Sequence, residues 1–200
     1  MIVYVESNFV LEIAFAQDES EACNSIVELA ESGNINLVIP AISVSEPYEV
    51  ILRRSKRRVE LNSQLSVELT QLSRSRPYAE IIERSQEIVS LLISSGQDEK
   101  LRLDSTLSRI LGCAEVIPIG GETLRSAIEF QSSLNLSPQD SLVYAAVVKH
   151  LDSTPPDQKC FLNRDSKDFL IPDIESQLAA FQCIMIPKFN DGVEYIRNSL

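Results

Sequence analysis

Short apolar runs alternate with stretches of helical periodicity along most of this chain. The apolar runs predict five buried strands, at residues 2–5, 36–39, 115–119, 159–163 and 183–186. The helical spacing predicts helices at about residues 7–16, 19–32, 43–54, 122–133, 138–151, 173–181 and 191–198. Short strands that alternate with helices are typical of an α/β fold, in which helices cover both faces of a parallel sheet.

Residues 59–112 depart from this alternation, because they carry apolar residues at helical spacing and no strand pattern. Pro77 and the run Ser94–Gly96 are expected to break this block into two or three helices. Just before it, Pro47 fits only the first turn of a helix, which places the start of that helix near Ser43–Ser45. We therefore expect one domain over the whole chain with a helical insertion, which adds to the core or forms a dimer face or a dock for a partner.

The net charge and the cysteines argue against several classes of function. The 200 residues carry a net charge of −11. This charge argues against a large surface that binds nucleic acid without sequence preference, but not against a small acidic site that binds cations. Four cysteines without C-x-x-C spacing and a single histidine argue against a structural zinc site. Free thiols are typical of a reducing cytoplasm, and no apolar run is as long as a membrane span. We expect a cytoplasmic protein that binds no membrane.

Several acidic residues follow predicted strands or begin predicted helices at one edge of the sheet. They are Glu6, Glu46, Asp140, Asp165 and Asp168. Each acid also has a structural explanation: Asp140 can interact favourably with the dipole of its helix, and Asp165 and Asp168 can form turns. Glu6 follows a buried strand and has no obvious helix to cap. Taken together, they lie where open parallel sheets bind ligands, and crowded carboxylates require a cation between them. This composition is typical of a Mg²⁺ or Mn²⁺ site, where ions bridge phosphate oxygens and activate water for in-line attack.

Four stretches at the two ends of the chain resemble the PIN-domain nucleases, which include the toxin ribonucleases of bacterial toxin–antitoxin pairs. The stretches are VESNFVL, VIPAISVSE, LSPQDSLVYAAVVKH and FLNRDSKDF, within about residues 1–55 and 114–187. The resemblance implies a three-layer α/β/α sandwich with a central parallel sheet of about five strands. It also implies Mg²⁺- or Mn²⁺-dependent cleavage of single-stranded or structured RNA. The candidate partners are RNA, an antitoxin or another protein, and a second copy of the chain.

The resemblance also assigns roles to individual residues. Carried over by position, Glu46, Asp140 and Asp165 hold metal, and Asp168 is an accessory ligand or supports the ligands. Asn8 orients the first carboxylate or a water. These roles, like the activity, are implied by the family pattern.

Two positions depart from the family pattern. Glu6 stands where the family has Asp, and the extra methylene moves its carboxylate by up to about 1.5 Å, one carbon–carbon bond. Asn163 stands where a small hydroxyl residue is usual, although its amide still donates and accepts hydrogen bonds. Three hypotheses follow, the third being an unrelated α/β protein whose acids at the sheet edge coincide by chance. In the first, Glu6 is a working ligand of an endoribonuclease with Glu46, Asp140 and Asp165; in the second, the protein is a degenerate PIN-like module that binds RNA or a protein without cleaving.

One dense run of basic residues follows the start of the helix that is predicted after the second strand. It consists of Arg53, Arg54, Lys56, Arg57 and Arg58. Beside a metal site, such a run is suited to hold an RNA backbone, although cations also suit the end of a solvated helix. With a net charge of −11, this run is the most suitable place on the chain for a phosphate backbone.

Overall fold

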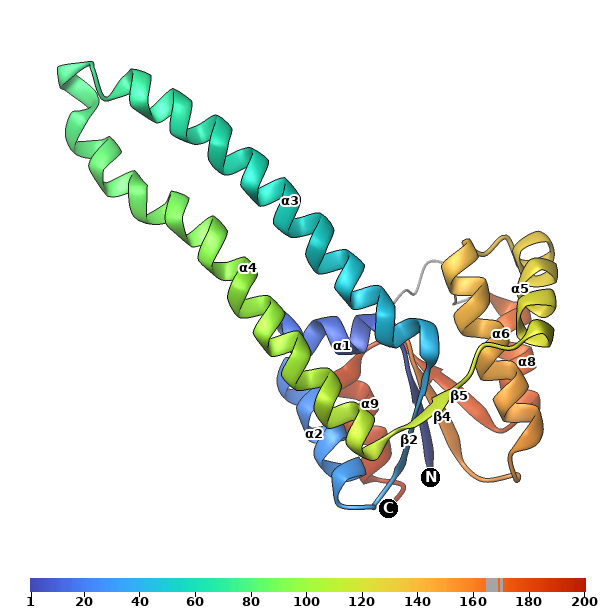
Figure 1. Ribbon diagram of the computed structural model, residues 1–200. Helices are drawn as coiled ribbons and strands as arrows, with labels where there is room; N and C mark the ends of the chain where they lie inside the picture. Colours follow the sequence, from blue (N-terminus) through green and yellow to red (C-terminus); the bar gives the residue numbers. More distant parts are fainter. Residues whose placement is uncertain (165–168, 170) are drawn as a thin grey trace.

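The computed structural model describes residues 1–164, 169 and 171–200, with the side chains of residues 79–80 and 83–86 excepted. These residues form a five-stranded parallel sheet in the order β3-β2-β1-β4-β5 (Figure 1). The strands are β1 (Ile2–Val5), β2 (Asn36–Pro40), β3 (Glu115–Ile117), β4 (Lys159–Leu162) and β5 (Cys183–Ile186). The predicted α/β/α sandwich is confirmed.

Helices cover both faces of the sheet. One layer is formed by α1 (Ser7–Ala14), α2 (Ser20–Glu31) and α9 (Phe189–Arg197). The other layer is formed by α6 (Pro138–Ser153) and α8 (Pro172–Ala180), with α5 (Gly121–Leu134) packed on α6. Val3 and Val5 of β1 pack in the first core and Tyr4 in the second, which explains why this strand is apolar at every position.

Two long helices leave the sandwich as a projecting hairpin. They are α3 (Ala41–Leu72) and α4 (Ala79–Cys113), joined through the short 3₁₀ helix η1 (Arg76–Tyr78) (Figure 1). The base of α4 is buried in the first core through Leu103, Leu107 and Ile110. We call residues 55–101 the arm. The predicted helical insertion is therefore core at its base and a two-helix projection beyond it.

The structure corrects two expected boundaries in this hairpin. The helix after β2 begins at Ala41, so Pro47 lies inside α3. Pro47 forfeits only the hydrogen bond to the Ser43 carbonyl, and it is itself buried, as is Ile51 one turn later. The expected break at Ser94–Gly96 is absent, because α4 runs on through it while packed along α3. Tertiary packing overrides the local propensity at both places.

All four cysteines are free, and Cys23, Cys160 and Cys183 are buried. No helix in the described part of the chain is both long enough and apolar enough to cross a membrane.

Candidate acidic site

A pocket of about 330 Å³ lies at the carboxyl edge of the sheet. It collects residues from the exits of β1 and β4, from α1, from residues 46–54 of α3 and from the start of α6. Seven of the predicted site residues line it: Glu6, Asn8, Glu46, Arg53, Arg54, Asp140 and Asn163. The predicted ligands Asp165 and Asp168 lie outside the described residues. Positions far apart in sequence therefore meet where parallel sheets bind ligands.

Glu6 has a structural role that the sequence did not reveal. It is the N-cap of α1, where its Oε2 accepts hydrogen bonds from the backbone N–H of Asn8 at 2.9 Å and from Oγ of Ser7 at 3.0 Å. The expectation that Glu6 has no helix to cap is thus wrong. The extra methylene of glutamate lets the carboxylate fold back over the first turn of α1, a role usually filled by shorter side chains.

The other oxygen of Glu6 has no such partner. The residue is 5% exposed, and Oε1 is buried without a hydrogen-bond partner among the described residues. Burial, and then the negative charge of Glu46, raise the pKa of Glu6 to about 7, against the opposing bonds from Asn8 and Ser7. An unpaired buried carboxylate oxygen is costly, and a cation would offset this cost.

Asp140 lies in the first turn of α6 and forms reciprocal hydrogen bonds with Ser137. The Ser137 hydroxyl accepts a hydrogen bond from the Asp140 N–H at 3.1 Å and donates to Oδ2 of Asp140 at 2.5 Å. Pro138 at the first helical position completes this helix start. The helix-start role expected for Asp140 is confirmed, and it also brings the carboxylate to the pocket.

The basic run divides into three groups. Arg53 and Arg54 line the pocket, and the guanidinium of Arg54 stacks over the Phe15 ring at 3.9 Å from its centroid. Lys56 and Arg57 line an adjacent hollow on α3, together with Arg53. Arg58 donates to both oxygens of Glu99 on α4, at 2.7 and 2.8 Å, so its guanidinium is engaged within the arm.

The carboxylate oxygens that line the pocket are of the kind that a hard divalent cation prefers. Carboxylate oxygens are the preferred ligands of Mg²⁺ and Mn²⁺, and Glu6, Glu46 and Asp140 share the pocket that contains the unpaired Oε1. Within residues 1–164, 169 and 171–200, however, no group of three or more potential ligand side chains is close enough to hold an ion.

Sequence reasoning missed a second buried carboxylate near the pocket. Glu12 of α1 is almost fully buried and accepts hydrogen bonds from the Arg164 guanidinium and from the backbone N–H of Glu19 at 2.8 Å. The only signal was an acidic residue between the apolar positions Val10 and Ile13, which by itself does not name a partner.

Comparison with known proteins gives a match to a protein family and a similarity to a solved structure. The PIN domain family matches residues 3–169, a range that contains the whole arm and every residue lining the pocket. No curated protein matches significantly. The chain is similar to the crystal structure of VapBC2 from Rickettsia felis bound to a DNA fragment from their promoter. The identity is 14%, the match covers 93% of this chain and 98% of that one, and the TM-score is 0.45.

Proposed function

The chain belongs to the PIN domain family, and from that premise we propose that it is an endoribonuclease that hydrolyses RNA phosphodiester bonds at the acidic pocket. The cofactor of this proposed activity is Mg²⁺ or Mn²⁺. One observation carries the proposal: carboxylates from three distant segments share a pocket in which one buried oxygen of Glu6 has no partner among the described residues.

Each pocket residue has a role in this proposal. Glu6, Glu46 and Asp140 would each supply carboxylate oxygens to a cation that needs further ligands from outside the described residues, and the cation would supply positive charge to a reacting phosphate. Asp165 is a further ligand and Asp168 an accessory one, both assigned from the sequence alone. These acids together keep a cation at the site and repel other anions until the cation is bound.

The polar and basic neighbours position the substrate. The amides of Asn8 and Asn163, which line the same pocket, orient a carboxylate or a water by hydrogen bonding. Arg53 and Arg54 offer guanidinium groups to a phosphate at the pocket rim, and Lys56 and Arg57 continue the basic surface along α3. An RNA strand would thus extend from the acidic pocket along the base of α3, while Arg58 remains paired with Glu99.

The test is cleavage of a mixed single-stranded RNA pool with Mg²⁺, Mn²⁺ or EDTA. Asp140→Asn should abolish metal-dependent cleavage, whereas Asp152→Asn, an exposed acid at the other end of α6, should cleave like wild type. Cleavage by the Asp140→Asn variant at the wild-type rate would remove the acidic pocket as the site. Equal loss in both variants would point to a stability effect of changes on α6.

The second candidate is a module that binds RNA or a protein partner without cleaving. It is favoured by the cap formed by Glu6, since one carboxylate oxygen is already engaged by Ser7 and Asn8. Glu6→Asp distinguishes the two candidates. If only the Glu6→Asp variant cleaves, the native site is silenced by one methylene; if wild type cleaves and Glu6→Asp is no better, Glu6 is a working ligand.

A toxin-type role is part of the proposal and rests on the four family-like motifs. In such a role, cleavage of cellular RNA arrests growth and an antitoxin, a partner protein, suppresses it. Induced expression of wild type should stop growth of a bacterial host, and Asp140→Asn should not. Normal growth with soluble, active wild-type protein would argue against this role.

A further inference from the structure

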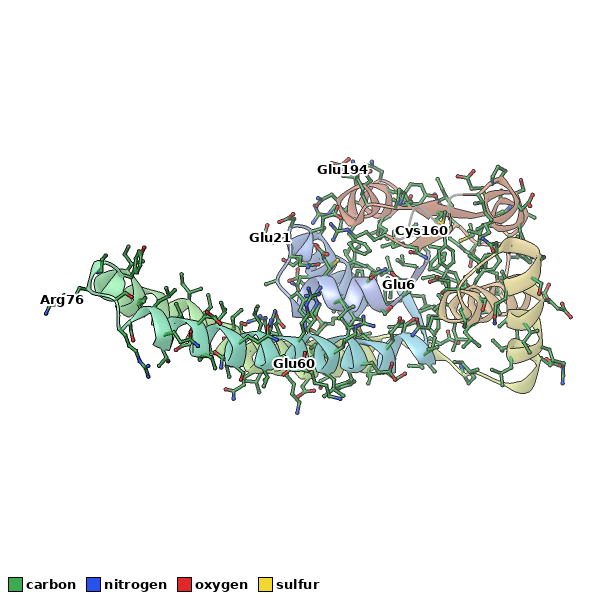
Figure 2. All side chains as sticks on the ribbon, turned by 90° about the horizontal axis from the view of Figure 1, so that it is seen from above. Glu6, Glu21, Glu60, Arg76, Cys160 and Glu194 are labelled. Atoms are coloured by element: carbon green, nitrogen blue, oxygen red, sulfur yellow. The ribbon has the colours of Figure 1, made fainter. Side chains whose placement is uncertain are left out.

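The acidic pocket extends along α1, away from the edge of the sheet. Asn8 and Leu11 of α1 line the pocket, and Phe15 follows one turn later on the same face of that helix. In the view from above, Glu6 lies near the point where α1, α3 and α6 come together (Figure 2). Glu6 and Phe15 are nine residues apart, which is about 14 Å at helical rise. The pocket therefore has one end at Glu6 and another toward Phe15.

The residues that α3 presents to the pocket change from acidic to basic in the same direction. Glu46, Val50 and Arg54 line the pocket at intervals of four residues, so they lie on one face of α3. Glu46 adds its negative charge to burial in raising the pKa of Glu6, whereas Arg54 lies over the Phe15 ring. The two helices thus run side by side in one direction and give the pocket an acidic end and an arginine end.

Arg54 is supported on one face of its guanidinium group. The central carbon of the guanidinium lies 3.9 Å from the centroid of the Phe15 ring, a contact typical of arginine stacked on an aromatic side chain. Phe15 packs against the first core, and the carbonyl oxygen of its neighbour Ala14 accepts a hydrogen bond from Arg102 of α4 at 2.8 Å. The ring is therefore a fixed support, and the guanidinium is positioned before a ligand binds.

The remaining binding capacity of the Arg54 guanidinium is unused within the described part of the chain. The residue is exposed, and no described residue forms a hydrogen bond or an ion pair with it. By contrast, Arg58 pairs with a carboxylate and Arg102 with a carbonyl oxygen. The face of the Arg54 guanidinium that points away from Phe15, and the N–H groups in its plane, are thus open to a ligand in the pocket.

A nucleobase matches the arginine end of the pocket. Bases of single-stranded RNA stack on guanidinium planes and aromatic rings, and every base has such a face to offer. Leu11 and Val50, both partly exposed, add apolar surface between Arg54 and the acidic end. A phosphate alone would leave this surface unused. A base inside a duplex has no free face, because its neighbours stack on both sides.

The neighbouring Arg53 has different surroundings. It lines both the acidic pocket and the adjacent hollow that contains Lys56 and Arg57, whereas Arg54 contacts α1 through Phe15. Successive residues of a helix point about 100° apart, which separates the two guanidinium groups. Arg53 therefore belongs to the basic surface along α3 and provides a matched comparison for Arg54.

On the basis of the proposed function, in which RNA is the substrate, we propose that the arginine end of the pocket is a nucleobase subsite. An unpaired base stacks there on the outer face of the Arg54 guanidinium. Because this end lies about 14 Å along α1 from Glu6, the base belongs to a nucleotide that flanks the cleaved bond. The N–H groups in the guanidinium plane stay available to a phosphate. The substrate is therefore RNA that is single-stranded next to the cleavage position.

The test compares intact RNA with RNA that lacks one base. Single-stranded RNAs about six nucleotides long, intact or with one abasic nucleotide at each position in turn, are titrated with protein. The protein carries Asp140→Asn and no metal is added, so that the RNA is not cleaved and the acidic end repels it less. Fluorescence anisotropy gives the dissociation constants. Because stacking of one base contributes about 5- to 150-fold in affinity, we expect a loss of at least about fivefold at one or two adjacent positions.

Three variants made in that protein identify the group on which the base stacks. Arg54→Lys keeps the positive charge but removes the planar face, so the abasic loss should disappear. Arg53→Lys makes the same change one residue earlier and should retain the abasic loss, whatever it does to overall affinity. Phe15→Leu keeps an apolar side chain but removes the ring, and should reduce the abasic loss because the guanidinium is no longer supported. Melting temperatures of the three variants report on the fold.

Four outcomes would overturn the proposal: no position with an abasic loss, an abasic loss that Arg54→Lys retains, equal removal of the loss by Arg53→Lys, or no binding of RNA. Cleavage by the wild type judges the proposed function separately. A protein that shows the abasic loss but never cleaves RNA has the subsite without the nuclease. A protein that cleaves RNA without an abasic loss has the nuclease without the subsite.

Discussion

Glu6 and Glu46 line one pocket, where burial and then the negative charge of Glu46 raise the pKa of the Glu6 carboxyl to about 7. The same carboxyl caps α1 through Oε2, while Oε1 has no hydrogen-bond partner in the described part of the chain. The fold thus keeps an acid where ionisation is unfavourable unless a cation is bound. Such stored instability is typical of functional sites rather than of structural caps.

The stability of the metal-free protein should therefore fall as Glu6 ionises. Its pKa is raised from 4.5 to about 7, so the native state holds this proton more tightly than the unfolded chain. This contribution is complete below about pH 4.5 and is lost as pH rises through about 7. At about pH 8 in EDTA, Glu6→Gln should raise the free energy of unfolding by about 1–3 kcal/mol. Denaturant unfolding of Glu6→Gln and of the exposed control Glu129→Gln, at both ends of this range, measures the effect.

Divalent cations should reverse this order of stability, so that wild type becomes more stable than Glu6→Gln. Mn²⁺ should raise the melting temperature of wild type at about pH 8, where Glu6 is ionised, and should raise that of Glu6→Gln far less. Equal stabilisation of the two variants would mean that the ion binds elsewhere and would remove Glu6 from the ligand set.

The free part of the basic run should control RNA affinity. Lys56→Glu with Arg57→Glu should weaken RNA binding by at least about tenfold and lower the slope of log K against log salt by about 1–2, because two phosphate contacts are lost. The matched control is Arg125→Glu with Arg197→Glu, which makes the same charge change on α5 and α9. Fluorescence anisotropy at several salt concentrations gives both quantities. Equal losses in the two pairs would indicate an effect of net charge alone.

Two glycines in helices should respond to alanine in opposite directions. A Cβ at Gly96 would lie 3.8 and 3.9 Å from atoms of Arg58 and Ser55, which is ordinary contact, so Gly96→Ala should stabilise by about 0.5–1 kcal/mol. A Cβ at Gly192 would lie 2.8 Å from a methyl of buried Leu162, so Gly192→Ala should destabilise by about 1–3 kcal/mol. Chemical denaturation of both variants checks the signs, and a stabilised Gly192→Ala would show that the α9–β4 contact yields easily.

The sequence predicts the strands well because their signal is local. Each strand is a short apolar run, and the observed order of elements follows from such runs and the helical stretches between them. The features that the sequence does not predict are contacts between distant segments. Nothing local shows that Arg58 pairs with Glu99 or that α3 supports α4 through Gly96, and these contacts turn an expected helical block into a projecting arm. At the site, the strand-end rule brings the acids together, but the cap formed by Glu6 depends on a side-chain conformation that residue type does not specify.

The ion pair between buried Glu12 and partly exposed Arg164 should be a major local support of the sandwich beside the pocket. Glu12 is almost fully buried, whereas the Arg164 side chain is 43% exposed, so the guanidinium keeps much of its hydration while the carboxylate depends on it. Glu12→Ala leaves Arg164 and the backbone N–H of Glu19 without their acceptor and opens a space in α1, and should lower the free energy of unfolding by about 1–3 kcal/mol. Glu28→Ala, an exposed change on α2, is the control and should stay within about 0.5 kcal/mol of wild type. If the pair is coupled, the double variant Glu12→Ala with Arg164→Ala costs less than the sum of the single changes; additive losses would show that Glu12 acts through Glu19 alone.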